Sequence, residues 1–218
     1  MKNYFRRKWL LTGLLGVVFA CQSDYLDINT DPNNPTQVDL ALMLPSSQAA
    51  FVNAFLANSN NATAAMVDQV HSGTWGRWLQ TNSDFSEDWR GLYAQSLKDI
   101  ETIVEEGEAR GLKGYVGIAK IQKAYVYSLL VDLWGDVPFS EALRTPNPKF
   151  DRGEDIYAAL FPLLDEAVAD LRGTNGNVGT VPAIADILYR GDLTRWIKVA
   201  RTPKSAGTTL LSPRSRPT

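Results

Sequence analysis

Between Leu40 and Ala200 the apolar residues recur every three or four positions, and this spacing limits the fold more than any other feature of the sequence. Residues at this spacing share one face of an α-helix, and that face must be buried against another element. No segment longer than a few residues alternates apolar and polar side chains, as a strand with one buried face would. The pattern therefore predicts an all-α fold.

Two long helices are predicted next to each other, over residues 86–109 and 115–134. Gly111 ends the first of them, and Gly135 followed by Pro138 ends the second. Long helices joined by so short a connection form an antiparallel pair. We therefore expect an αα-hairpin of the type that is stacked in tetratricopeptide repeats.

Five other helices are predicted from the same spacing. The first starts near Leu40 and has Pro45 in its first turn, where proline is tolerated. Another follows Asp151 and Glu154, which are spaced as a capping box, and Pro162 should kink that helix or delay its start. The remaining three helices fall at 63–79, 182–189 and 192–200, and residues 139–149 form a loop that contains prolines.

The first 20 residues have the order of a secretory signal. Four basic residues precede an apolar run from Trp9 to Ala20, which is shorter than the roughly 20 residues that span a bilayer. Val18-Phe19-Ala20-Cys21 resembles a bacterial lipobox, in which the cysteine becomes the lipidated first residue. Because Cys21 is the only cysteine, we expect a lipid anchor there rather than a redox group. The alternative is an ordinary signal peptide with an incidental cysteine at the junction.

Composition divides the rest of the chain into three parts. Residues 21–39 are rich in Asp, Asn and Pro, which suits a flexible linker behind the anchor. Residues 40–200 contain the predicted helices and form one domain. Residues 201–218 contain eleven Ser, Thr, Pro or Gly residues without an acidic or aromatic residue, and we expect a disordered or non-native tail.

The charge of the chain excludes nucleic acid as a partner. Of its 22 basic residues, four lie before Cys21 and four lie after Ala200, and neither end has an acidic residue. Residues 22–200 therefore hold 14 basic and 24 acidic residues, a net charge of −10. Such a surface repels phosphate backbones, which a nucleic-acid-binding protein must neutralise.

Few residues of this sequence suit catalysis or metal binding. His71 is the only histidine and Cys21 lies at the anchor, so neither a nucleophile–base pair nor a zinc site is predicted. No glycine-rich phosphate-binding motif is present, and we expect no cofactor. A pair of carboxylates for glycoside hydrolysis stays open, because the chain has 24 acidic residues.

The tryptophans are the main candidates for ligand contacts. Trp75 and Trp78 lie in a segment with Gly73 and Gly76, which weaken a helix, and either core packing or sugar stacking fits them. They are the candidate binding residues. The other three tryptophans of the domain are predicted to pack in the core; they are Trp89, Trp134 and Trp196.

Four stretches together resemble the SusD/RagB family of outer-membrane nutrient-binding lipoproteins from Bacteroidetes. The strongest is Ala124–Phe139, a helix that ends in Gly-Asp-Val-Pro. The other three follow the order of the family behind the lipobox; they are Tyr25–Pro35, Phe150–Tyr157 and Asp186–Trp196, the last with a Gly-Asp-x-x-x-Trp segment. The resemblance extends from about Cys21 to Ala200 and then stops.

The resemblance implies a surface lipoprotein that binds glycans or other nutrients and delivers them to a TonB-dependent outer-membrane transporter, without catalysis. It also implies that residues 40–200 are the N-terminal part of a domain about twice as long. We therefore expect a truncated or frameshifted member of the family. The alternatives are a lipid-anchored helical scaffold for protein partners and a carbohydrate hydrolase.

Overall fold

The computed structural model describes residues 39–56, 64, 67, 85–174 and 176–206. The predicted signal, Cys21, the linker up to Val38 and residues 207–218 lie outside the described residues, as does most of the helix predicted over 63–79. Within the described ranges the fold is all-α, as predicted, with one pair of two-residue strands. None of the helices in those ranges is long and apolar enough to cross a membrane.

Helix α2 (Leu40–Leu56) begins where the sequence predicts. The Asp39 carboxylate accepts a hydrogen bond from the Ala41 amide at 2.9 Å, and the Asp39 carbonyl accepts bonds from Leu42 and Met43. Asp39 thus satisfies amides that the first turn leaves without a partner. The prediction that Pro45 lies in the first turn is wrong, because a helix that begins at Leu40 places Pro45 beyond its first turn, inside the helix.

The helix predicted over 86–109 is present, but its middle is not α-helical. It consists of α4 (Ser86–Arg90), the π-helix η2 (Gly91–Leu97) and α5 (Lys98–Ala109). The π-helical turn buries Tyr93 and Ser96, which bond to the Pro138 and Ser47 carbonyls respectively. These bonds are tertiary, and the apolar spacing within the helix carries no sign of them.

Helix α6 (Lys113–Trp134) follows α5 after a short turn at Gly111, so the predicted αα-hairpin is confirmed. Gly111 has φ 66° and Gly135 has φ 78°, both in the left-handed region that ends helices and favours glycine. The likeness of the pair to a tetratricopeptide repeat stays a prediction.

A short hairpin connects α6 to the next helix. Strands β1 (Val137–Pro138) and β2 (Phe150–Asp151) pair antiparallel, with Val137 opposite Asp151, and enclose the predicted loop over 139–149. Helix α7 (Gly153–Leu171) follows β2 directly.

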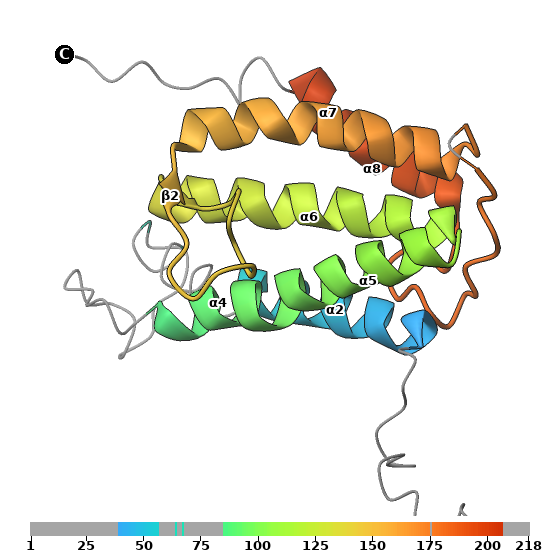
Figure 1. Ribbon diagram of the computed structural model, residues 1–218, viewed down its shortest axis with the longest axis horizontal. Coiled ribbons are helices and arrows are strands. Elements are labelled where there is room, and N and C mark those ends of the chain that lie inside the picture. The colour runs from blue at the N-terminus through green and yellow to red at the C-terminus, as the bar shows by residue number, and fades with distance from the viewer. Residues whose placement is uncertain (1–38, 57–63, 65–66, 68–84, 175, 207–218) are drawn as a thin grey trace, which may run out of the picture. The chain divides into compact units, whose positions relative to one another are not determined.

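The predicted capping box at this helix is wrong. Arg152 is the N-cap and caps with its backbone alone. The Asp151 carboxylate instead accepts hydrogen bonds from the amides of Phe139 and Ser140, at 3.1 and 2.7 Å. Pro162 lies inside α7 and does not delay its start, and Figure 1 shows α7 as one continuous helix.

The chain after α7 departs from two predicted helices. Residues 182–189 form consecutive turns instead of a helix. Helix α8 (Leu193–Ala206) runs past Ala200, so residues 201–206 belong to a helix and not to the predicted tail.

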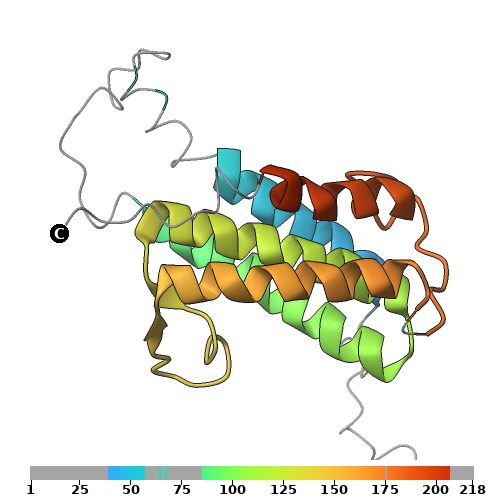
Figure 2. The same cartoon turned by 90° about the horizontal axis from the view of Figure 1, so that it is seen from above.

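Helix α6 is the centre of the packing. It contacts α2, α5, α7 and α8; Figure 1 shows it between α7 and the α4–α5 pair, and Figure 2 shows it alongside α7. The two helices α6 and α7 lie close together at Gly117, where an added Cβ would lie 2.6 Å from the Leu171 side chain and 2.9 Å from the Ala167 carbonyl oxygen. The core consists of side chains from all these helices, among them Leu44, Leu97, Ile118, Ile121, Leu130, Ile156 and Leu164.

Candidate functional site

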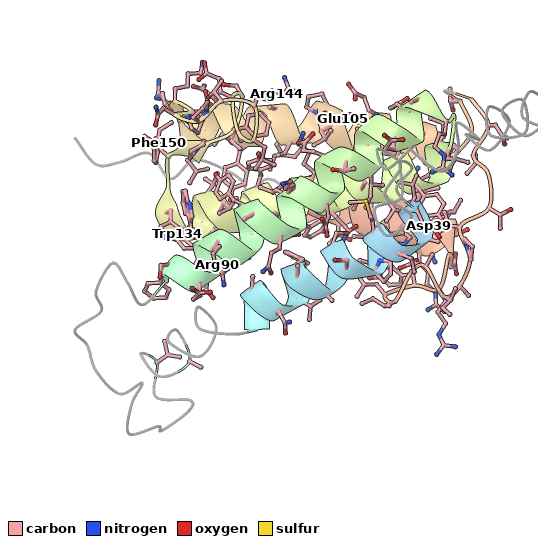
Figure 3. All side chains as sticks on the ribbon, turned by 60° about the horizontal axis from the view of Figure 1, so that its bottom comes forward. Asp39, Arg90, Glu105, Trp134, Arg144 and Phe150 are labelled. Carbon is pink, nitrogen blue, oxygen red and sulfur yellow. The ribbon has the colours of Figure 1, made fainter. Side chains whose placement is uncertain are left out.

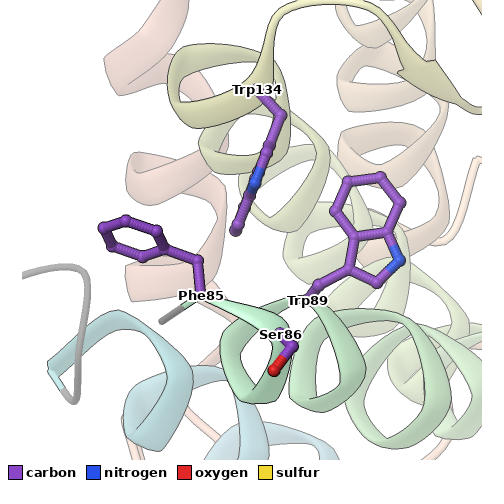
Figure 4. Close-up of a pocket in the computed structure, with 4 residues that line it drawn as sticks. All are labelled: Phe85, Ser86, Trp89 and Trp134. Atoms are coloured by element: carbon purple, nitrogen blue, oxygen red, sulfur yellow. The ribbon is translucent and has the colours of Figure 1, made fainter. Parts of the chain in front are cut away.

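An aromatic pocket lies between the start of α4 and the end of α6. Phe85, Ser86, Trp89 and Trp134 line it, and its volume is about 250 Å³ (Figure 4). Three of the four residues are aromatic, and the pocket is open to solvent. This is the candidate ligand site.

The two tryptophans set the shape of the pocket. The rings of Trp89 and Trp134 meet edge to face, with centroids 5.3 Å apart and planes 84° to each other. The Trp89 ring also contacts Tyr93, with centroids 4.7 Å apart. The Tyr93 hydroxyl donates to the Pro138 carbonyl at 2.7 Å, so the base of the aromatic cluster is fixed to the β1 strand.

Burial raises the pKa of the Tyr93 hydroxyl far above its ordinary value, and the Asp151 charge adds to this effect. Tyr93 therefore stays neutral and keeps its role as a donor. The aromatic cluster is thus a fixed support for the pocket.

The core prediction for the tryptophans is confirmed for Trp196, whose side chain is only 2% exposed. Trp89 and Trp134 pack against the core on one side and line the pocket on the other. Trp75 and Trp78, the residues that the sequence favours for ligand contacts, lie outside the described residues, as does His71.

The sequence contained one signal for this pocket. In an antiparallel hairpin of 86–109 and 115–134, residues near 89 and near 134 lie at the same open end. The hairpin pattern therefore brings Trp89 and Trp134 together, although 45 positions separate them. Phe85 has no such signal, because it precedes the helix.

Two buried polar clusters lie outside the pocket. In the first, the Asp186 carboxylate accepts hydrogen bonds from the Gln48 amide at 2.9 Å and from the Trp196 indole at 2.8 Å. The backbone amides of Leu188, Tyr189 and Gly191 donate to the same carboxylate. Burial alone would raise the pKa of the Asp186 carboxyl, but the bonds from Trp196, Gly191, Gln48 and Tyr189 outweigh it and hold the pKa below its ordinary value.

The second cluster joins α5, α6 and α7. Lys120 bonds to the buried Asp170 at 2.8 Å and lies 3.4 Å from Glu108 and 3.6 Å from Glu166. Burial would lower the pKa of Lys120, but Asp170 and the two glutamates raise it above its ordinary value. Both clusters have the features of structural polar networks. Among the described residues, no group of three or more His, Cys, Asp or Glu is arranged to hold a metal ion.

The walls of the pocket determine what it can bind. Flat aromatic faces fit the apolar faces of sugar rings, and a hydroxyl such as that of Ser86 can exchange hydrogen bonds with a sugar. On α4, the helix that carries Ser86 and Trp89, Glu87 and Arg90 pair with each other at 2.6 Å. The arrangement suits binding, and no nucleophile–base pair lines the pocket.

The fold resembles those of solved SusD-like proteins. A SusD/RagB family protein from Bacteroides thetaiotaomicron matches with a TM-score of 0.67 and 27% identity, over 79% of this chain and 38% of that one. A chitin-binding protein matches with a TM-score of 0.57 and 28% identity, over 72% of this chain and 36% of that one. A SusD homolog from Bacteroides fragilis, 24% identical with a TM-score of 0.55, shares the fold.

The chain thus spans less than two fifths of the length of these structures. No curated protein matches it. A family model, SusD-like_2, matches residues 32–208, which is well over half of the chain. The chain therefore belongs to this SusD-like family, which is described as starch-binding and associating with the outer membrane.

Proposed function

We propose that this chain is a glycan- or nutrient-binding lipoprotein of the outer membrane that delivers its ligand to a TonB-dependent transporter, without catalysis of its own. Membership of the SusD-like family carries the proposal. The lipobox at Cys21 supports a lipid anchor, and cell-surface exposure follows from the role of capturing nutrients.

The aromatic pocket is the proposed ligand contact within the described residues. A sugar ring would stack on Trp134 or Trp89 and exchange hydrogen bonds with Ser86. Trp75 and Trp78 remain proposed contacts on the basis of the sequence alone. The pocket has aromatic walls and one hydroxyl, which favours binding over hydrolysis.

Replacement of Trp134 tests this proposal. We expect Trp134→Ala in the full chain to weaken binding of the cognate oligosaccharide by about tenfold or more, because a loss of ~1.4 kcal/mol of contact energy corresponds to that factor. Isothermal titration calorimetry with starch and chitin oligosaccharides measures the affinity, and assay of released sugars detects any hydrolysis.

Two variants keep the result interpretable. Trp134→Phe retains an aromatic face and should keep most of the affinity, while Leu133→Ala, at the exposed neighbouring position on α6, should leave it unchanged. Unchanged affinity in a folded Trp134→Ala protein would exclude the pocket as the site. Release of sugars during incubation would favour the hydrolase instead.

A further inference from the structure

The aromatic pocket lies at an end of the domain where acidic side chains outnumber basic ones. We define the pocket end as residues 85–90, which contain α4, and residues 131–156, from the last turn of α6 to the first turn of α7. These two ranges hold eight acidic and four basic side chains, so their net formal charge is −4. Figure 3 shows Arg90 and Trp134 at this end and Glu105 nearer the other.

Most of the positive charge at the pocket end is already matched by negative charge. Three of the four cations lie beside a carboxylate of the same range; the pairs are Arg90–Glu87, Lys149–Asp151 and Arg152–Glu154. An anionic ligand in the pocket would have to compete with these carboxylates for the same cations. The pocket end therefore offers little positive charge to such a ligand.

The two carboxylates closest in sequence to Trp134 have neutral hydrogen-bond donors. Asp132 accepts from the Tyr157 hydroxyl, and Asp136 accepts from the Gly153 amide at 2.9 Å. Burial, with a contribution from Asp132, raises the pKa of the Tyr157 hydroxyl far above its ordinary value, so Tyr157 stays a neutral donor.

The charges of these two carboxylates act on the pocket. Neither Asp132 nor Asp136 forms an ion pair within the part of the chain that the structure describes. Each is two positions from Trp134, so its Cα atom lies within about 7–8 Å of the Trp134 Cα atom. This separation is shorter than the Debye length of about 10 Å at 0.1 M salt, so salt does not screen the two charges completely.

The aromatic walls add to this negative potential. The faces of aromatic rings carry partial negative charge. Figure 4 shows Phe85 and Trp89 on opposite sides of the Trp134 ring, and the planes of the two tryptophans are 84° apart. An ammonium group over the Trp134 face would be attracted by the ring and by both carboxylates, and tryptophan is the best cation–π partner. A carboxylate or sulfate at the same place would be repelled.

We propose that the pocket selects glycans by their charge: it binds sugars that carry an ammonium group most tightly and neutral sugars next, and it rejects sugars that carry carboxylate or sulfate groups. The proposal rests on the proposed function, because it specifies which glycans occupy that same pocket. The selection is electrostatic, so it decreases when salt screens the charges of the pocket end.

Quenching of tryptophan fluorescence by small ions tests the charge of the pocket without a glycan. The Trp134 signal is the difference between the emission of the full chain and that of Trp134→Phe. At low salt, caesium ion should quench this signal at least about threefold more than iodide, each relative to its quenching of free tryptophan. Added sodium chloride should remove the difference, because it screens the field. Equal quenching by the two ions at low salt would overturn the proposal.

Removing the charges beside Trp134 tests their role. In the double variant Asp132→Asn with Asp136→Asn, each side chain keeps an oxygen that accepts its hydrogen bond, and two charges are lost. The preference for caesium over iodide should fall at least about twofold. Glu105→Gln with Glu106→Gln removes two charges near the other end of α5 and should leave this preference unchanged. Equal effects of the two double variants would contradict the proposal.

Three oligosaccharides of the same length and linkage test the selection itself. They are a cello-oligosaccharide, the chitosan oligosaccharide in which ammonium groups replace the 2-hydroxyls, and the C6-oxidised oligosaccharide that carries carboxylates. At about 20 mM salt, calorimetry should give the chitosan chain at least about fivefold higher affinity than the neutral chain, and the oxidised chain at least about tenfold lower affinity. The buffer must be acidic enough to keep the amines protonated. At about 0.5 M salt, the three affinities should approach each other.

The outcomes separate this proposal from the proposed function. An oxidised chain that binds as tightly as the neutral chain at low salt would reject selection by charge and support a glycan ligand. Binding of none of the three, together with the preference for caesium, would support the negative potential of the pocket and count against a glycan ligand.

Discussion

Asp186 shows how one residue can organise a segment that lacks regular structure. Its carboxylate lies in the interior and all five of its hydrogen-bond donors are neutral; they come from α2, from the turns after Pro182 and from α8. Only an ionised carboxylate can accept from so many donors. The resemblance to a known motif marks the residue, but the spacing does not reveal its role, because Gln48 is 138 positions away.

Replacing Asp186 by Asn should destabilise the protein. The new NH2 group would face donors instead of accepting from them, and we expect the free energy of unfolding to fall by about 2–4 kcal/mol. Urea unfolding followed by tryptophan fluorescence measures it. Glu105→Gln, on an exposed face of α5, should change stability by less than about 0.5 kcal/mol. Equal effects of the two substitutions would contradict this role of Asp186.

The lowered pKa of Asp186 fixes the direction of the pH dependence. Its stabilising contribution is fully present above the ordinary value of 3.8 and is lost as the pH falls through the lower folded-state pKa. The stability difference between the wild type and Asp186→Asn should therefore shrink as the pH falls below about 4. A difference that stays constant down to the lowest pH at which the protein folds would argue against an ionised Asp186.

At the scale of the elements, the positions of the long helices could be predicted and their finer geometry could not. The apolar period located 86–109 and 115–134, because a buried helix face requires it. It did not reveal the π-helix η2, whose Tyr93 and Ser96 bond to other elements. The capping box failed for a similar reason, since Asp151 bonds to Phe139 and Ser140 across the hairpin.

The close approach of α6 and α7 predicts that Gly117→Ala destabilises the protein. The added Cβ would meet the Ala167 carbonyl oxygen, which belongs to a rigid backbone and cannot move aside easily. We expect a loss of about 1–2 kcal/mol in thermal unfolding, after the better helix propensity of Ala is included.

Gly91→Ala is the matched control for this substitution. Its Cβ would meet only Ala54 at 3.7 Å, an ordinary contact, so the protein should be unchanged or slightly more stable. If both variants behave alike, helix packing at Gly117 is not tight.

At the scale of the whole molecule, the sequence predicted the fold class and the αα-hairpin, and it assigned Trp89 and Trp134 to core packing. It did not predict the pocket, because Phe85 precedes α4 and its place depends on tertiary contacts. The candidate contacts Trp75 and Trp78, which the glycines beside them favour as ligand contacts, lie outside the described residues. Membership of the SusD-like family supports one proposed function for the fold, the pocket and these candidate contacts.

We propose that the whole molecule is attached to the membrane through Cys21. We expect Cys21→Ser in the full chain to move the protein from the membrane fraction to the soluble fraction, because the acyl chains would be absent. Fractionation and labelling with a lipid precursor measure this. Ser23→Ala, two residues further on, should remain membrane-bound and labelled. An unlabelled wild-type chain would reject lipidation.

The π-helix between α4 and α5 has a consequence for comparing this chain with its relatives. Each turn of a π-helix contains one residue more than a turn of an α-helix. The π-helical segment Gly91–Leu97 therefore rotates the side chains of α4 about the helix axis relative to those of α5. An alignment with a relative whose helix is regular must open a one-residue gap within these positions. Without that gap, Trp89 would be matched to a neighbour of its true counterpart, and a role assigned by homology would fall on the wrong side chain.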